Sequence, residues 1–282
     1  MGLPQPDPLS KGEGQLDLIR NSKQMNRISS LFQKQGNDIL SIYFTAGFPE
    51  LKDTRTVLKA LQDANTDLVE IGMPYSDPVA DGETIQGSNQ QALDNGMTVA
   101  ELFNQLGNFR NEGITLPVIL MGYFNPVYQY GVEAFCEKCA EVGVDGLILP
   151  DLPFEEYLLN YKETFEKYGL LNIFLITPQT SDERIRQIDA GSAGFIYMVS
   201  SASVTGATSG VNQNMEAYFE RVNGLGLKNP RLIGFGIKDK DSFSKAAKHA
   251  SGAIIGSQFV RVLESSKGNL EEGIKRFVSQ LR

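Results

Sequence analysis

Two carboxylates, Glu70 and Asp81, occupy contrasting positions in one segment of the chain. Glu70 follows the apolar run that begins at Leu68, whereas Asp81 lies in a loop rich in Pro, Gly and Ser. A buried carboxylate costs free energy unless another group pairs with it or uses it. A loop stiffened by proline holds the second acid at a fixed distance, and two acids in unlike environments can divide acid, base and electrostatic work. The alternative is a solvated strand end followed by an ordinary turn.

Glycines in the second half of the chain form a candidate phosphate site. Gly206, Gly236 and Gly256 follow or end three predicted strands, and Ser257 opens a short helix. Backbone N–H groups approach a ligand closely where there is no Cβ, and a helix N-terminus adds unpaired N–H groups and partial positive charge. The alternative is that these glycines only make tight turns.

The segment 200–214 contains no charged residue and is rich in Ser, Thr, Gly and Ala. Long connections in compact domains are usually lids, binding loops or disordered segments. A neutral lid would suit an acidic protein that admits a phosphate, because it adds no charge repulsion. Thr205 in this segment could hydrogen-bond a catalytic carboxylate when the lid closes.

Histidine and cysteine are too sparse for most metal sites. His249, the only histidine, falls in a predicted surface helix, so metal centres and triads that rely on histidine are not expected. Cys136 and Cys139 form a C-x-x-C pair without a second pair, and we interpret them as structural thiols in a reducing cytoplasm. Proton chemistry is therefore expected from carboxylates or tyrosines, with no metal.

The elements that must position these residues alternate regularly from Asp38 onward. Buried parallel strands typically read as continuous apolar runs, as several do here. The predicted strands are Ile39–Thr45, Leu68–Ile71, Val118–Met121, Gly146–Leu149, Asn172–Thr177, Gly194–Val199, Leu232–Gly236 and Ala253–Ile255. The predicted helices are Leu51–Asp63, Thr84–Asn95, Val99–Asn111, Val132–Val142, Glu155–Tyr168, Asp182–Asp189, Asn214–Asn223 and Asp239–His249, with a capping box at Thr180–Glu183.

Eight such units in ~240 residues predict an α/β protein with a (β/α)8 TIM barrel. A doubly wound open sheet is the alternative, since the number of units does not distinguish a closed sheet from an open one. Function lies at the carboxyl ends of the strands in a barrel, and phosphate recurrently binds after strands 7 and 8. This architecture places Glu70, Asp81 and the glycines on one rim.

Composition bounds the class of protein. The chain has 282 residues, of which 41% are hydrophobic and 21% charged, and its net charge is −8. The negative charge disfavours a nucleic-acid partner, and no apolar run approaches the ~18 residues that span a bilayer. Residues 1–24 lack periodicity and are rich in Pro, Gly and charge, so we predict a leader, disordered or added by cloning, before a single barrel domain over 25–282.

Four blocks of the chain resemble the tryptophan synthase alpha subunit family, in the family's order. The resemblance covers the chain from about Met25 to the C-terminus. The blocks are Glu70–Gln86, Leu149–Pro153, Ser203–Ala207, and Gly234–Ile237 with Gly256-Ser257. The resemblance implies a carbon–carbon lyase that cleaves indole-3-glycerol phosphate into indole and glyceraldehyde 3-phosphate.

The resemblance also implies roles for the two acids. Glu70 would be the acid/base that protonates indole C3 and takes the proton of the glycerol hydroxyl. Asp81 would hydrogen-bond the indole N–H and stabilise the positively charged ring. Both roles fit a desolvated Glu with a raised pKa and a loop Asp that stays ionised.

Further site residues follow from the same resemblance. Tyr197, at the end of the sixth predicted strand, matches an active-site tyrosine of the family, and Tyr43 stands where the family often has Phe beside the indole. Ser201 and Ser203 depart from a common Arg-Ser-Gly-Val-Thr-Gly loop, which implies altered lid flexibility. The residues that match the phosphate site are Gly206, Gly236, Gly256 and Ser257.

Alpha subunits usually dock on a beta subunit that carries pyridoxal phosphate and condenses indole with serine, in an alpha2beta2 heterotetramer. The resemblance therefore implies no cofactor in this chain itself. Asp77 and Pro150–Pro153 lie in blocks that resemble the docking face, whereas Asn125-Pro126 fits a docking loop or a plain helix start equally well.

Three other functions remain open from the sequence. One is a stand-alone indole-3-glycerol-phosphate lyase without a partner. Another is a non-catalytic phospholigand-binding barrel, although a binder does not need both Glu70 and Asp81. The third is a different phosphosugar barrel, either an isomerase or an epimerase.

Overall fold

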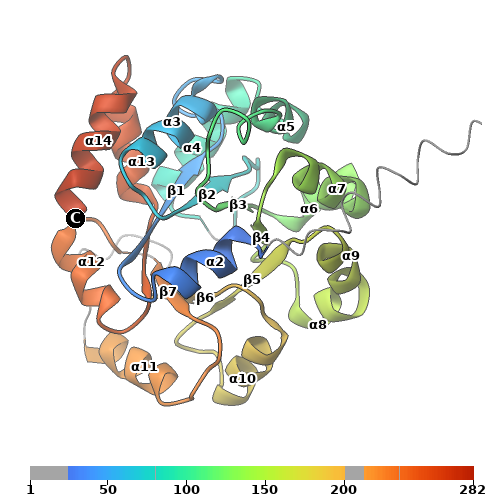
Figure 1. Ribbon diagram of the computed structural model, residues 1–282, viewed down its shortest axis with the longest axis vertical. Helices are drawn as coiled ribbons and strands as arrows, with labels where there is room; N and C mark the ends of the chain where they lie inside the picture. The colour runs from blue at the N-terminus through green and yellow to red at the C-terminus, as the bar shows by residue number, and fades with distance from the viewer. Residues whose placement is uncertain (1–24, 80, 201–212, 235) are drawn as a thin grey trace, which may run out of the picture.

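Eight parallel strands close into a barrel in the computed structural model, which describes residues 25–79, 81–200, 213–234 and 236–282 (Figure 1). Each strand pairs with its neighbour in the sequence, and β8 pairs with β1. The strands are β1 (Ile39–Thr45), β2 (Leu68–Gly72), β3 (Val118–Met121), β4 (Gly146–Ile148), β5 (Leu171–Ile176), β6 (Ile196–Val199), β7 (Arg231–Gly234) and β8 (Gly252–Ile255). The closed order confirms the (β/α)8 TIM barrel and excludes the open sheet.

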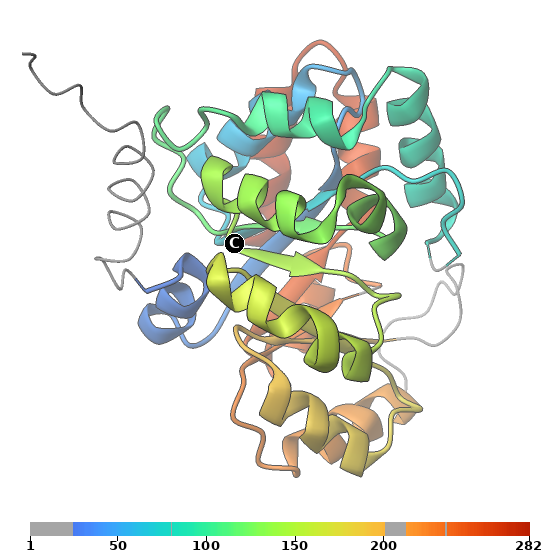
Figure 2. The ribbon, with the colours of Figure 1, turned by 90° about the vertical axis from the view of Figure 1, so that its right-hand side faces the viewer.

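Helices surround the barrel, and α2 (Arg27–Lys34) lies across one of its openings (Figures 1 and 2). The surrounding helices of the first half are α3 (Asp53–Asp63), α4 (Glu83–Asp94), α5 (Val99–Leu106), α6 (Phe124–Tyr130), α7 (Val132–Val142), α8 (Phe154–Glu156), the π-helical turn η2 (Tyr157–Tyr161) and α9 (Lys162–Lys167). Those of the second half are α10 (Asp182–Gly191), α11 (Gln213–Asn223), α12 (Lys240–Ala247), α13 (Ser257–Ser265) and α14 (Leu270–Leu281).

The apolar core has two layers, one inside the barrel and one between strands and helices. Ile39, Leu68 and Ile119 belong to the inner cluster, which also includes Ile28 from α2. The larger outer cluster contains the alternate strand residues, such as Leu40 and Val69, packed against helices. Because both faces of each strand are buried, the strands read as continuous apolar runs.

Several predicted boundaries differ from the structure. The helix predicted over Glu155–Tyr168 is interrupted by the π-helical turn. The helix predicted over Val99–Asn111 ends at Leu106, where the Gly107 N–H bonds the Asn104 carbonyl oxygen in a tighter turn. Ser181, rather than Thr180, caps α10 by accepting a hydrogen bond from the Arg184 N–H. Such ends depend on local hydrogen bonds that a spacing pattern does not resolve.

A buried carboxylate fastens the amino-terminal end of the barrel. Asp145, 3% exposed, accepts hydrogen bonds from Arg27 at 2.9 Å, Arg110 at 2.7 Å and the Val118 N–H at 2.9 Å. Arg110 also donates to the Gly143 carbonyl oxygen. The network ties α2 to β3 and to the start of β4.

Candidate active site

Glu70 lies inside the barrel near the carboxyl end of β2. Alternation along the strand turns Leu68 and Glu70 to the same face, and the carboxyl group is fully buried. The Ser41 hydroxyl of β1 donates a hydrogen bond to Oε1 at 2.8 Å, whereas Oε2 has no hydrogen-bond partner among the described residues. Burial raises the pKa of Glu70 to about 8, although the Ser41 hydrogen bond acts in the opposite direction. Much of this carboxyl is therefore protonated at neutral pH.

Asp81 lies in the loop after β2 and is half-buried. Burial raises the pKa of its carboxyl, and a hydrogen bond from the Tyr123 side chain opposes that shift. Tyr123 directly precedes α6, and its ring packs on that of Tyr75 at a centroid distance of 5.0 Å. Gln86 of α4 also holds the loop by donating to the Asp81 carbonyl oxygen at 2.7 Å.

Two tyrosines face the acids from β1 and β6. Burial raises the pKa of both Tyr43 and Tyr197, and the nearby charges of Glu70 and Asp81 raise them further. Tyr197 lies within β6, two residues before its end, rather than at the strand end as predicted. The structure thus brings these four side chains together from β1, β2, the following loop and β6.

Glycines at two strand ends make room for the tyrosine rings. A Cβ on Gly72 would lie 2.2 Å from the Tyr43 hydroxyl oxygen, and one on Gly234 would lie 2.1 Å from that of Tyr197. Gly256 flanks Tyr43 on its other side, where a Cβ would lie 3.5 Å from the ring. Gly72 and Gly234 therefore have a steric role, since any side chain there would displace a tyrosine.

The described part of the predicted phosphate site lies on the same rim. Gly236 has a φ of +74°, which favours glycine. Gly256 precedes α13, which begins at Ser257, and no described side chain caps the N-terminus of that helix. Its first N–H groups are suitably directed for an anion. Thr205 and Gly206 fall outside the described residues.

Comparison with known proteins identifies the family. A family model described as "Tryptophan synthase alpha chain" matches residues 29–282. The chain belongs to the tryptophan synthase alpha chain family. A tryptophan synthase alpha chain of Flavobacterium johnsoniae is 59% identical over 259 residues, covering 92% of this chain and 100% of the relative.

Solved structures agree with this assignment. The alpha chain of tryptophan synthase from Legionella pneumophila subsp. pneumophila superposes with a TM-score of 0.82 at 32% identity, covering 91% of this chain and 96% of that one. A tryptophan synthase complex from Pyrococcus furiosus gives a TM-score of 0.78 at 32% identity, covering 86% and 96%. The predicted family is confirmed, and with it a lyase of tryptophan biosynthesis that cleaves indole-3-glycerol phosphate.

Ser41 and Tyr123 contact the two proposed acids of this alpha chain, but the sequence did not predict them. Ser41 stands two residues before Tyr43 in one strand, so it faces the same side. That alternation was available as a signal, but it does not say which inward residue reaches Glu70. Tyr123 reaches Asp81 across the barrel rim from the loop after β3, a contact that spacing along the chain does not indicate.

Other candidate sites lie apart from these acids. Cys136 and Cys139 are free and fully buried, and burial raises the pKa of Cys136 to about 12, which suits structural thiols. His249 packs its ring on Phe219 at 5.5 Å. Within the described ranges, no group of three His, Cys, Asp or Glu side chains is placed to hold a metal, and no helix is long and apolar enough to cross a bilayer.

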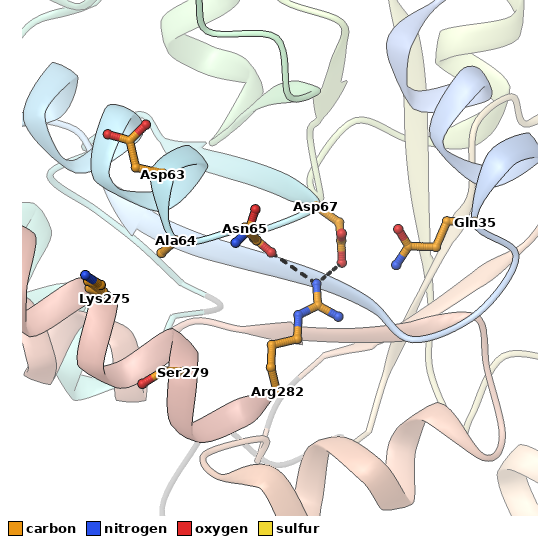
Figure 3. A pocket seen from close by; sticks show the side chains of 8 residues that line it. All are labelled: Gln35, Asp63, Ala64, Asn65, Asp67, Lys275, Ser279 and Arg282. Atoms are coloured by element: carbon orange, nitrogen blue, oxygen red, sulfur yellow. Dashed lines mark hydrogen bonds and ion pairs between the residues drawn. The ribbon is translucent and has the colours of Figure 1, made fainter.

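A cavity of about 540 Å³ lies at the opposite end of the barrel, beside the start of β2 (Figure 3). There Arg282, which follows α14, forms an ion pair with Asp67 and donates to the Asn65 carbonyl oxygen. The amino-terminal face of such barrels carries stability rather than catalysis. We therefore interpret this cavity as a gap beside a stabilising contact.

Proposed function

We propose that Glu70 carries the proton in the cleavage of indole-3-glycerol phosphate. The observation that carries this proposal is a buried carboxyl group with one anchored oxygen, one unpartnered oxygen among the described residues, and a pKa raised to about 8. Such a group can both give and accept a proton near neutral pH.

One carboxyl group can perform both proton transfers of the cleavage. Protonated Glu70 delivers its proton to indole C3, leaving a carboxylate and a positively charged ring. The carboxylate then takes the proton of the glycerol hydroxyl on the carbon attached to C3. That hydroxyl becomes the aldehyde as the carbon–carbon bond breaks, and the bonding electrons return to the indole ring. Glu70 ends protonated, ready for another turnover.

We propose that Asp81 binds the indole N–H and stabilises the ring while it is positively charged. The Tyr123 hydrogen bond lowers the pKa of Asp81 against the effect of burial, and so favours the charged form that this role requires. Neutral Tyr43 and Tyr197 would form the walls beside the indole. The proposed phosphate ligands are Gly206, Gly236, Gly256 and Ser257, with Thr205 closing on the site.

The proposed partner is a beta subunit that carries pyridoxal phosphate, in a cytoplasmic alpha2beta2 complex. The similar chain from Pyrococcus furiosus belongs to a structure of a tryptophan synthase complex. Segments after β2, β3 and β4 of this chain expose apolar side chains, with Val79 81%, Tyr128 60% and Leu159 80% exposed. These segments adjoin Asp77 and Pro150–Pro153, the proposed docking residues. Asn125 and Pro126 lie in the first turn of α6, which also suits the plain helix start.

Indole release from indole-3-glycerol phosphate by the purified chain tests the function. Glu70→Gln should retain substrate binding and lose indole formation by a factor of about 10²–10⁴, as expected for an essential acid/base. Glu83→Gln makes the same change at an exposed position and should retain the full rate. Normal turnover by Glu70→Gln would refute the role of Glu70.

The same assay separates a subunit from a stand-alone lyase. Addition of a beta subunit loaded with pyridoxal phosphate should raise the indole-forming rate if this chain works in a complex. A full rate that does not respond to the partner would instead support the stand-alone enzyme. A chain that begins at Met25 tests the proposed domain boundary, because it should fold and bind substrate as the full chain does.

A further inference from the structure

Ser41 gives the two oxygens of Glu70 different environments. Its hydroxyl is fully buried and donates to Oε1 at 2.8 Å, and Oε2 receives no hydrogen bond from the described residues. In the register of the barrel, Ser41 pairs with Leu68 and Tyr43 pairs with Glu70. Ser41 therefore approaches the carboxyl from the side remote from the rim where the substrate would enter.

We infer that Ser41 is the positioning residue of Glu70, fixing Oε1 as the anchored oxygen and leaving Oε2 as the oxygen that exchanges the proton with substrate. The inference rests on the proposed role of Glu70. An oxygen that accepts a hydrogen bond is the less favourable place for the proton of a neutral carboxyl group, so the proton resides on Oε2. The transfers to C3 and from the glycerol hydroxyl both take place at Oε2.

Among the described groups around Glu70, the Ser41 hydroxyl is the one that hydrogen-bonds its carboxyl group and opposes the rise of its pKa. Tyr43 from β1 and Tyr197 from β6 face it, and burial keeps both neutral through the working pH range. Asp81 approaches the same tyrosines from the loop after β2. From β3, the paired residue is the apolar Ile119. Among the described residues, no cation contributes to the shifted pKa of Glu70.

The decisive variant is Ser41→Ala, which removes the donor and leaves the strand intact. Because the hydrogen bond lowers the pKa of Glu70, its loss should move the basic limb of kcat/KM to higher pH by roughly 0.5–1 pH unit. The kcat should fall about tenfold as the carboxyl loses its fixed orientation, with KM unchanged. Ser41→Thr should restore both, since it keeps the hydroxyl.

A matched control removes a buried hydroxyl that does not reach Glu70. Ser88 is 2% exposed and bonds Thr45 at 2.7 Å, so Ser88→Ala should leave the basic limb where it is. An unmoved limb in Ser41→Ala, or a raised KM with unchanged kcat, would overturn the inference.

A titration of the Glu70 carboxyl by ¹³C NMR on the unliganded chain distinguishes this inference from the role of Glu70 itself. A higher titration midpoint in Ser41→Ala than in the parent supports the inference without reference to turnover. An unchanged midpoint overturns the role of Ser41. Neither result depends on whether Glu70→Gln is active, which tests the acid/base role alone.

Discussion

At the residue scale, burial governs the chemistry of the ionisable groups. Burial raises the pKa of Glu70 to about 8, and the single neutral hydrogen bond from Ser41 only partly opposes that shift. Arg27 and Arg110, the cations that pair with the buried Asp145, lie at the other end of the barrel. Both carboxyl groups are buried, but Asp145 has two cationic partners and Glu70 has none among the described residues.

The pH dependence of cleavage follows from the raised pKa of Glu70. In the proposed mechanism the first proton transfer needs protonated Glu70, so kcat/KM should decline as pH rises through about 8. Initial rates measured at a series of pH values from about 6 to about 10 define this basic limb of the pH profile. A limb centred near the ordinary carboxyl pKa would contradict the assigned chemistry.

Folding stability should report the same group independently of activity. Because the folded-state pKa of Glu70 lies above the ordinary carboxyl value, its contribution to the free energy of unfolding is fully present at acidic pH. This contribution is lost as pH rises toward about 8, because the buried group resists the ionisation that the unfolded chain allows. Glu70→Gln should therefore gain stability relative to the parent above that pH, by on the order of a few kcal/mol. Urea unfolding at about pH 5 and about pH 9, on either side of the pKa of Glu70, measures the difference. Glu83→Gln serves as the control.

At the scale of elements, neighbouring strands fit through paired large and small residues. The Tyr197 ring of β6 occupies the space left by Gly234 of β7, and the Tyr43 ring of β1 occupies that left by Gly72 of β2. The parallel register aligns these neighbours at the rim. Glycine at these strand ends thus determines where the tyrosine rings lie.

Gly234→Ala should disturb the site because its Cβ would come 2.1 Å from the Tyr197 hydroxyl oxygen. Overpacking of this kind costs about 1–3 kcal/mol, and the displaced ring should weaken substrate binding. Gly224→Ala is the matched control, since its closest contact is the Arg221 carbonyl oxygen at 3.4 Å. Thermal unfolding and KM of the two variants provide the comparison. Equal behaviour of the two variants would rule out a steric role for Gly234.

At the scale of the whole molecule, the two ends of the barrel have different tasks. The proposed acids and tyrosines lie at the carboxyl ends of the strands, as do Gly236 and Gly256. The network of Asp145 and the contact of Arg282 with Asp67 lie at the amino ends. The helix α2 covers that second opening and adds Ile28 to the inner core. Changes at the amino ends should therefore alter stability without altering catalysis.

Asp145→Asn should lower stability while sparing the active site. It leaves Arg110, which is only 15% exposed, without its anionic partner, and such a loss costs about 3–5 kcal/mol. Asp63→Asn breaks an exposed pair with Lys59 and should cost no more than about 0.5 kcal/mol. Chemical unfolding measures both. A large fall in kcat of folded Asp145→Asn, under conditions where it stays native, would argue against the division between the two ends.

The amino-acid sequence by itself determined the architecture and singled out the two proposed acids. Eight apolar runs alternating with amphipathic segments predict a barrel because strands buried on both faces need apolar residues throughout. Strands such as Ile39–Thr45 and Val118–Met121 have the predicted bounds. Glu70 stood out because a strand seldom ends on a carboxylate, and Asp81 because a stiff loop holds it at a fixed distance from Glu70. The family resemblance then implied different tasks for the two acids.

Only the tertiary structure decided which groups surround those acids. The closure of the sheet, the hydrogen bond from Ser41 to Oε1, the contact of Tyr123 with Asp81 and the space at Gly234 join residues of different strands or loops. Periodicity gives the face on which a residue lies, but not the neighbour that it meets across strands. The pKa of Glu70 depends on that neighbour and on burial, so it is a property of the folded barrel.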